Sequence, residues 1–112
     1  FVDESREAVG IVKENLAKCR FTAKVVQGDS LGYLRCAGKF DIIFLDPPYD
    51  SDLLDKSLEI IQNVDILTEG GIIVCESRRE KSLPEPRAPY VRALERSYGK
   101  VRISVYKRES SV

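Results

Sequence analysis

The chain has 112 residues, with 18 Lys plus Arg, 18 Asp plus Glu and no His, so its formal net charge is zero. A hydrophobic content of 43% is typical of globular proteins and excludes the apolar-poor, highly charged composition of disordered chains. The longest strongly apolar runs, residues 42–45 and 72–75, are far shorter than the ~20 residues that span a bilayer. We therefore expect a single domain without a membrane-spanning segment.

The use of cysteine and histidine restricts the possible chemistry. The three cysteines, Cys19, Cys36 and Cys75, are widely spaced, and no histidine is present to complete a zinc site. Mechanisms of the Ser-His-Asp and Cys-His types are excluded for the same reason. The pattern predicts reduced thiols in a cytoplasmic protein without a metal, whose chemistry uses carboxylates, hydroxyls or backbone groups.

The first third of the chain predicts alternating strands and helices. Residues 1–4 begin with Phe1 rather than Met and resemble the end of a strand, so we expect the chain to be a fragment. Apolar residues recur at spacings of three and four from Ser5 to Cys19, which predicts an amphipathic helix. A short strand over 22–27 and a brief helix over 30–36 follow in the prediction.

The rest of the chain continues this alternation and then changes. Phe40–Leu45 is an apolar, β-branched-rich run that predicts a central strand covered on both faces. We further expect a helix over residues 52–64 and strands over 72–76, 91–96 and 101–107, the last two joined across Tyr98-Gly99. The order predicts an α/β fold, with a Rossmann-like, mostly parallel sheet, helices on both faces and a C-terminal antiparallel β-hairpin.

Charge is distributed unevenly along the chain. Residues 1–77 carry 8 basic and 14 acidic side chains, whereas residues 78–112 carry 10 basic and 4 acidic ones. The basic C-terminal third is either a solvated face or a surface that contacts phosphates. The candidate contacts in the proline-containing loop are Arg78, Arg79, Lys81 and Arg87.

The motif Asp46-Pro47-Pro48-Tyr49 follows the predicted strand 40–45 directly. Ligands of open α/β sheets bind at the carboxyl ends of strands, although two prolines could also form only a rigid turn. An exocyclic amine of a base is a poor nucleophile that needs positioning. The Asp46 carboxylate and the Pro47 carbonyl can each accept one N–H and direct the amine lone pair, while Tyr49 stacks on the base.

These residues resemble the class I S-adenosylmethionine-dependent methyltransferases that act on amino groups. The resemblance implies that Asp3 holds the ribose hydroxyls of S-adenosylmethionine. It also implies that Asp29 binds the adenine amino group and that Ser30 reads the adenine through its backbone amide. In this comparison Asp46, Pro47, Pro48 and Tyr49 form the catalytic loop.

A narrower resemblance covers nearly the whole chain. Residues 15–16, 40–49, 74–77 and 98–107 are similar to the RsmD-type methyltransferases, which modify a guanine N2 of bacterial small-subunit ribosomal RNA. The resemblance implies S-adenosylmethionine as cofactor and ribosomal RNA, or the assembling small ribosomal subunit, as partner. The ending Tyr98-Gly99 plus strand is its most discriminating part.

One departure from that family affects the expected fold. The first strand and Gly-rich turn of the family precede the segment that matches here, and that strand is central in the family order 3-2-1-4-5-7-6. We therefore expect residues 1–112 to form one partial domain whose sheet is split. We also expect the chain alone to be inactive, and to pair with a missing fragment or form a strand-exchanged oligomer.

Other functions remain open at this stage. The same motif serves DNA adenine-N6 methyltransferases equally well. Protein glutamine methylation is less favoured, because those enzymes carry Asn at the position of Asp46. In a third alternative, residues 78–112 act as a non-catalytic RNA-binding module and the acidic part is scaffold.

Overall fold

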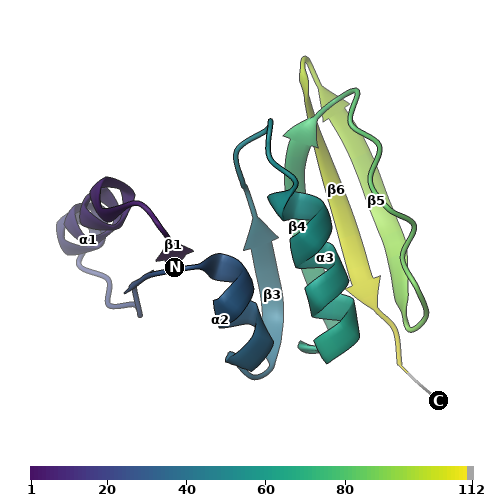
Figure 1. Ribbon diagram of the computed structural model, residues 1–112, viewed down its shortest axis with the longest axis horizontal. Coiled ribbons are helices and arrows are strands. Elements are labelled where there is room, and N and C mark those ends of the chain that lie inside the picture. The colour runs from purple at the N-terminus through teal and green to yellow at the C-terminus, as the bar shows by residue number, and fades with distance from the viewer. Residues whose placement is uncertain (111–112) are drawn as a thin grey trace. The chain divides into compact units, whose positions relative to one another are not determined.

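The computed structural model describes residues 1–110, which form two compact units, Phe1–Cys36 and the part that begins at Ala37. In chain order the elements are β1 (Val2–Asp3), α1 (Arg6–Cys19), β2 (Val26–Gln27), α2 (Ser30–Cys36), β3 (Phe40–Leu45), α3 (Leu53–Val64), β4 (Leu67–Arg78), β5 (Tyr90–Tyr98) and β6 (Val101–Arg108) (Figure 1).

The first unit is a parallel strand pair with two helices. In this pair Val2 lies opposite Val26, and Asp3 lies opposite Gln27. α1 begins as predicted, because the Ser5 hydroxyl accepts a hydrogen bond from the Ala8 N–H at 3.1 Å. The strand predicted over 22–27 is limited to its last two residues, since β1 offers only two residues to pair with.

The second unit is a four-stranded sheet with the order β3-β4-β6-β5. β3 and β4 pair in parallel, and the pairs β4–β6 and β6–β5 are antiparallel. The predicted α/β fold and its C-terminal hairpin are confirmed, with two parallel and two antiparallel pairs over both sheets. β4 is longer than the predicted strand 72–76, because the Gly70-Gly71 segment is part of the strand rather than a break before it.

One face of this sheet forms the core. α3 lies across the sheet in Figure 1, and its Leu58 and Ile61 are fully buried. Ile73 and Cys75 of β4 are equally inaccessible, as is Tyr106 of β6. Burial also raises the pKa of the Cys75 thiol to about 12, which makes it an unreactive core residue. Cys19 and Cys36, which are also free thiols, are exposed.

The prediction that Phe40–Leu45 is a central, doubly covered strand is wrong for this structure. β3 is the edge strand of its sheet, and Ile42 and Phe44 are 65% and 60% exposed. Only Ile43, which points to the opposite face, is buried. In the second unit, as far as residue 110, the sheet has no helix on the Ile42 face and no strand beyond β3.

The predicted division of the sheet is confirmed. β1 and β2 form a sheet of their own, and the remaining strands form the other. Whether residues 1–112 act as one partial domain stays a prediction. None of the helices within residues 1–110 is long and apolar enough to cross a membrane. The same residues hold no cluster of three or more Cys, Asp or Glu side chains placed to bind a metal ion.

An ion pair joins the end of α3 to the hairpin. Asp65, the C-cap residue of α3, has a left-handed φ of 60°. Its carboxylate accepts hydrogen bonds from Arg108 Nε at 2.8 Å and Nη2 at 2.9 Å, and from the Tyr90 hydroxyl at 2.8 Å. These contacts, led by the Arg108 hydrogen bonds, lower the pKa of Asp65 to about 2.

We predict that Asp65→Asn lowers the free energy of unfolding by about 1 kcal/mol at pH 7, a value reduced for the partial exposure of the pair. Asn tolerates the left-handed φ, so the substitution tests the charge. The folded-state pKa is below the ordinary 3.8, so the contribution is present above pH 4 and disappears as the pH falls toward 2. Urea denaturation at pH 7 and pH 2.5 measures both effects.

The matched control is Asp52→Asn. Asp52 pairs with Lys56 at 2.9 Å, but both side chains are more than half exposed. Its substitution should lower the free energy of unfolding much less than Asp65→Asn does. An equal loss from both variants at pH 7, or a loss for Asp65→Asn that persists undiminished at pH 2.5, would contradict the assignment.

Candidate active site

The predicted catalytic loop lies where β3 and β4 end. The two strands are parallel with Leu45 opposite Cys75, so their carboxyl ends meet at one edge of the sheet, the upper edge in Figure 1. Continuing this register brings Asp46 beside Glu76. Sequence reasoning gave Glu76 no role, and only the pairing register indicates its position.

Tyr49 is held by side chains from β4. Its hydroxyl donates a hydrogen bond to Glu76 Oε1 at 3.1 Å. The Arg78 guanidinium lies over the Tyr49 ring at 5.3 Å from the centroid and also contacts Asp50 Oδ1 at 3.4 Å. Tyr49 remains 38% exposed. The ring is therefore oriented by two partners and still accessible to a planar ligand.

The electrostatics of the loop are dominated by two neighbouring acids. Partial burial raises the pKa of Asp46, and the negative charge of Glu76 and a hydrogen bond between the two carboxyl groups raise it further. The pKa of Tyr49 is also raised, first by desolvation and then by its hydrogen bond to Glu76. Asp46 is still exposed, so a ligand can reach a carboxyl group whose proton affinity depends on Glu76.

The loop backbone leaves one acceptor free. The Pro48 carbonyl accepts hydrogen bonds from the Ser51 N–H at 3.2 Å and the Ser51 hydroxyl at 2.7 Å. Among residues 1–110, no donor is bonded to the Pro47 carbonyl. The two prolines carry no N–H groups that could compete for an acceptor. Asp46 and Pro47 thus offer the two acceptors that the sequence analysis expected.

The three predicted cofactor residues lie in the first unit. Asp3 ends β1, and Asp29 follows β2, so both lie at the carboxyl edge of the parallel pair. Asp3 Oδ1 accepts the Ser5 N–H at 2.8 Å. The two carboxylate oxygens of Asp29 accept the N–H groups of Leu31 and Gly32, each at 3.2 Å, so Asp29 also caps α2.

These residues fit an adenosine group. Asp3 Oδ2 has no hydrogen-bond partner in the described part of the chain, which leaves it able to accept from ribose hydroxyls. Each Asp29 oxygen retains a lone pair beyond its capping bond. The Ser30 N–H belongs to the first turn of α2 and has no acceptor among residues 1–110.

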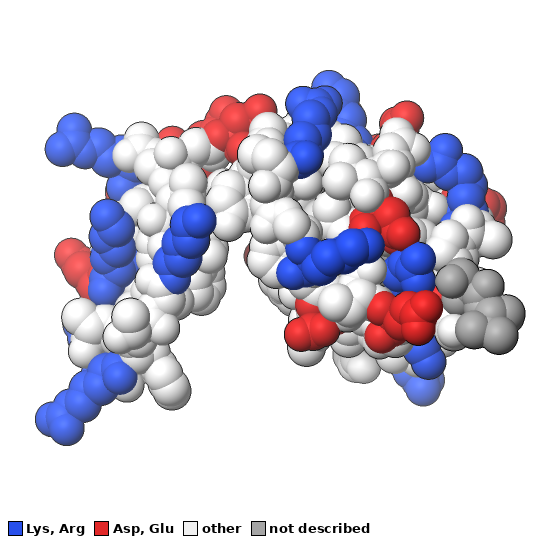
Figure 2. Space-filling view, turned by 90° about the horizontal axis from the view of Figure 1, so that it is seen from below, with Lys and Arg blue, Asp and Glu red and all other residues white. Residues whose placement is uncertain are grey.

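Three of the four predicted RNA contacts are already engaged within the protein. Arg78 contacts Tyr49 and Asp50, as described above. Lys81 Nζ lies 3.4 Å from Asp55 Oδ2, and Arg87 Nη2 donates to Asn63 Oδ1 at 2.6 Å. Arg79 is exposed, and within residues 1–110 its side chain has no hydrogen bond or ion pair. Acidic and basic side chains lie close together in the right-hand part of Figure 2.

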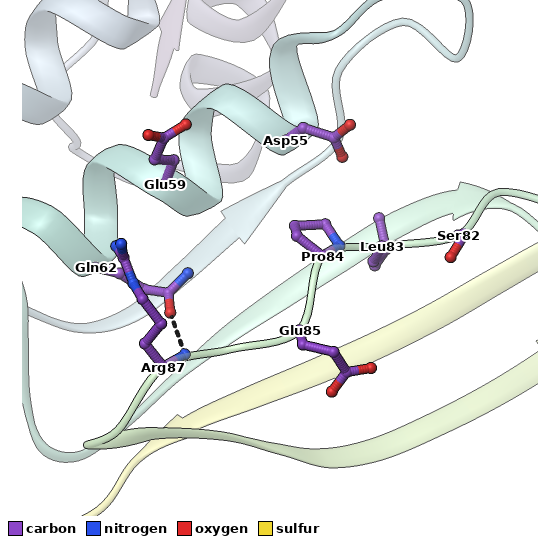
Figure 3. A pocket seen from close by; sticks show the side chains of 8 residues that line it. All are labelled: Asp55, Glu59, Gln62, Ser82, Leu83, Pro84, Glu85 and Arg87. Carbon is purple, nitrogen blue, oxygen red and sulfur yellow. Dashed lines mark hydrogen bonds between the residues drawn. The ribbon is translucent and has the colours of Figure 1, made fainter.

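A hollow of about 470 Å³ in the second unit lies away from the catalytic loop. Figure 3 shows Asp55, Glu59 and Gln62 extending from α3, opposite the loop segment 82–87, whose Arg87 N–H donates to Gln62 Oε1 at 2.7 Å. Three carboxylates line the hollow, which disfavours phosphates. Beside the catalytic loop the space is only about 10 Å³, enough for one water, so a base would have to lie on the exposed side of Tyr49.

We predict that Glu76→Gln lowers the pKa of Asp46. The substitution removes the charge that opposes ionisation of Asp46, while the Gln carbonyl can still accept the Tyr49 hydroxyl. An NMR titration of the carboxyl carbons measures the change directly. Glu80→Gln, an exposed acid two residues beyond the end of β4, is the matched control and should leave the Asp46 titration unchanged. An Asp46 pKa that does not respond to Glu76→Gln would show that Glu76 does not act on it.

Comparisons with known proteins agree with this arrangement. The family model described as "Conserved hypothetical protein 95" matches residues 1–107. The Bacillus subtilis protein named "Putative rRNA methyltransferase YlbH" is 37% identical over 114 residues, which cover 96% of this chain and 62% of that protein. "Ribosomal RNA small subunit methyltransferase D" of Escherichia coli K12 is 29% identical over 99 residues, which cover 87% of this chain and 50% of that protein.

The fold is also found among solved structures. The Escherichia coli protein named "Putative methyltransferase yhhF" has a TM-score of 0.85 at 27% identity, covering 96% of this chain and 62% of that one. The chain thus spans 50–62% of the length of these relatives. A family model that matches nearly all of its residues shows that the chain belongs to the family described as Conserved hypothetical protein 95, the RsmD family that its sequence resembles.

Proposed function

We propose that the protein to which this chain belongs transfers a methyl group from S-adenosylmethionine to guanine N2 of small-subunit ribosomal RNA. The observation that carries the proposal is the Asp46–Tyr49 loop, which offers a carboxylate and an unused carbonyl beside an oriented, accessible tyrosine. The names of the two curated relatives, both rRNA methyltransferases, support ribosomal RNA as the substrate class.

The residues of the loop have separate tasks in this reaction. Ionised Asp46 accepts one N–H of the exocyclic amine, and the Pro47 carbonyl accepts the other, so that the lone pair on nitrogen is directed away from the ring. Tyr49 stacks on the base and fixes its plane. S-adenosylmethionine supplies a methyl group on a positively charged sulfur. As the N–C bond forms, the bond from the methyl carbon to sulfur would break and leave a neutral thioether, and the ionised Asp46 carboxylate accepts the proton that the amine loses.

Cofactor binding is assigned to the first unit. Asp3 accepts from the ribose hydroxyls, Asp29 accepts from the adenine amino group, and the Ser30 N–H donates to the adenine ring. The spare acceptor capacity of both carboxylates supports these roles.

RNA binding is assigned to the last residue of β4 and to the loop that follows it. Arg78, Arg79, Lys81 and Arg87 contact phosphates of ribosomal RNA or of the assembling small subunit, in the cytoplasm. The Arg79 side chain is exposed, so it can contact a phosphate without breaking a contact within residues 1–110. The pairs formed by Arg78 and Lys81 are partly exposed, so exchanging their carboxylate partners for phosphates costs little.

We also propose that residues 1–112 are inactive without the rest of the protein. The two sheets do not pair with each other, and β3 presents an unpaired edge. The chain therefore needs either the remaining part of its protein or a strand exchanged with a second copy to complete its sheet.

We predict that Asp46→Ala in the full-length protein lowers kcat by about 10²- to 10³-fold, because one positioned acceptor is lost. Affinity for S-adenosylmethionine should change by no more than a few fold. Incorporation of labelled methyl groups into small-subunit RNA measures turnover. Asp52→Ala, a neighbouring acid paired only with Lys56, is the control and should retain turnover within about twofold.

Three results would contradict the proposal in different ways. Full turnover by Asp46→Ala would contradict the catalytic role proposed for the loop. Preferential methylation of adenine in DNA would favour the DNA adenine-N6 alternative. Salt-dependent RNA binding by the wild type without any methyl transfer would favour a non-catalytic RNA-binding module.

A further inference from the structure

The tip of the β5–β6 hairpin lies at the same edge of the sheet as the catalytic loop. β6 runs antiparallel to β4, with Arg78 opposite Val101, so the turn at Gly99 lies beside the carboxyl end of β4. The Arg79 N–H donates to the Lys100 carbonyl at 2.9 Å and extends this pairing beyond the strands. Figure 1 shows the turn at the upper edge, as it does the loop after β3.

The strand register connects the hairpin tip to the residues that hold Tyr49. Glu76, Ile103 and Arg96 form one row across β4, β6 and β5. Arg78, Val101 and Tyr98 form the next row. Directly paired residues of antiparallel strands point to the same face, so Arg96 and Tyr98 share the face of Glu76 and Arg78. At about 4.8 Å per strand, each row spans roughly 10 Å.

The side chains at the hairpin tip are exposed and form no polar contacts within residues 1–110. Tyr98 is 64% exposed, and Arg79, Arg96 and Lys100 are exposed as well. Across residues 1–110, none of these four side chains forms a hydrogen bond or an ion pair. Three exposed cations therefore lie at the same hairpin tip as an exposed aromatic residue, with Glu80 the one acid that adjoins Arg79 in sequence.

Other cations of the same hairpin behave differently. Arg92 lies 3.3 Å from Glu85, Arg102 lies 3.0 Å from Glu95, and Arg108 binds Asp65. Their guanidinium groups stabilise contacts within the hairpin and between the hairpin and its surroundings. The cations at the tip have no such role, so positive charge is left unbalanced where the hairpin adjoins the catalytic edge.

We propose that Tyr98, Arg79, Arg96 and Lys100, the hairpin rim, bind the single-stranded RNA that flanks the target base. Single-stranded RNA is recognised by stacking bases on exposed aromatic side chains and by pairing phosphates with Lys and Arg. The rim offers both groups at the catalytic edge, where Tyr98 and Arg96 share the face of Glu76 and Arg78, and Arg79 and Lys100 follow one residue beyond them. A base next to the target base stacks on Tyr98, and the phosphates of the flanking nucleotides contact the three cations. This inference rests on the proposed function, of which it specifies the substrate contact.

The test measures RNA binding by the full-length protein separately from methyl transfer. The probe is a fluorescently labelled single-stranded RNA oligonucleotide of mixed sequence, and binding is followed by anisotropy at several salt concentrations. Tyr98→Ala should weaken binding by about 5- to 100-fold, the effect of losing one base–aromatic stack. Tyr98→Phe keeps the ring and should bind within about twofold of the wild type.

The cations have a matched control in the same hairpin. The triple variant Arg79→Gln, Arg96→Gln, Lys100→Gln should make the slope of log affinity against log salt shallower by about 2, since each lost phosphate contact on a single strand contributes about 0.7. Lys107→Gln removes an exposed cation at the opposite end of β6, where Lys107 pairs with Ile72 and Val91. It should leave the slope within about 0.5.

The outcomes separate this inference from the proposed function. If Tyr98→Ala and the triple variant both bind RNA with the affinity and salt slope of the wild type, the proposal that the hairpin rim binds RNA is wrong. Loss of binding to a polyglutamate peptide, with RNA binding intact, would instead assign the surface to an acidic protein partner and also overturn it. If RNA binding depends on the hairpin rim but the wild-type protein transfers no methyl group, the proposal for the rim holds and the methyltransferase proposal is refuted. Unchanged unfolding midpoints confirm that the variants are folded, as expected for exposed positions.

Discussion

The pairing of β4 on both of its sides is the constraint on which the second unit depends. β4 pairs in parallel with β3 and antiparallel with β6, and its Leu67, Ile73 and Cys75 are fully buried. Parallel pairing places the loop after β3 at the carboxyl end of β4, and antiparallel pairing places the β5–β6 turn at that end as well. Three segments that are far apart in sequence therefore meet at one edge of the sheet.

The alternation of side chains along β4 separates stability from chemistry. Cys75 and Ser77 point into the core that α3 covers, whereas Glu76 and Arg78 point to the other face and reach Tyr49. A shift of one residue in register would bury the charges of Glu76 and Arg78 and expose the core residues. The large cost of burying unpaired charge thus fixes the geometry of the site as strictly as it fixes the core.

Local patterns in the sequence predicted where helices and strands occur better than they predicted how deeply each element is buried and what it pairs with. The helices 30–36 and 52–64 and the hairpin around Tyr98-Gly99 were correct, because apolar periodicity and a turn glycine act over a few residues. The strand over 22–27 was too long, since its length depends on a two-residue partner. The predicted burial of both faces of Phe40–Leu45 was wrong for a similar reason, because burial depends on which other elements pack against the strand. Glu76 was missed as part of the site, since only the β3–β4 register brings it to Asp46.

The same limit applies to the basic C-terminal third. A net charge of +6 for residues 78–112 cannot distinguish cations that hold the fold together from cations that await a ligand. In the structure Arg92, Arg102 and Arg108 are partly buried and paired, and their charge is balanced within the protein. Arg79, Arg96 and Lys100 are exposed at the catalytic edge and, within residues 1–110, unpaired. The electrostatic field that a polyanion would encounter therefore arises from the position of a few unpaired charges rather than from the composition of the segment.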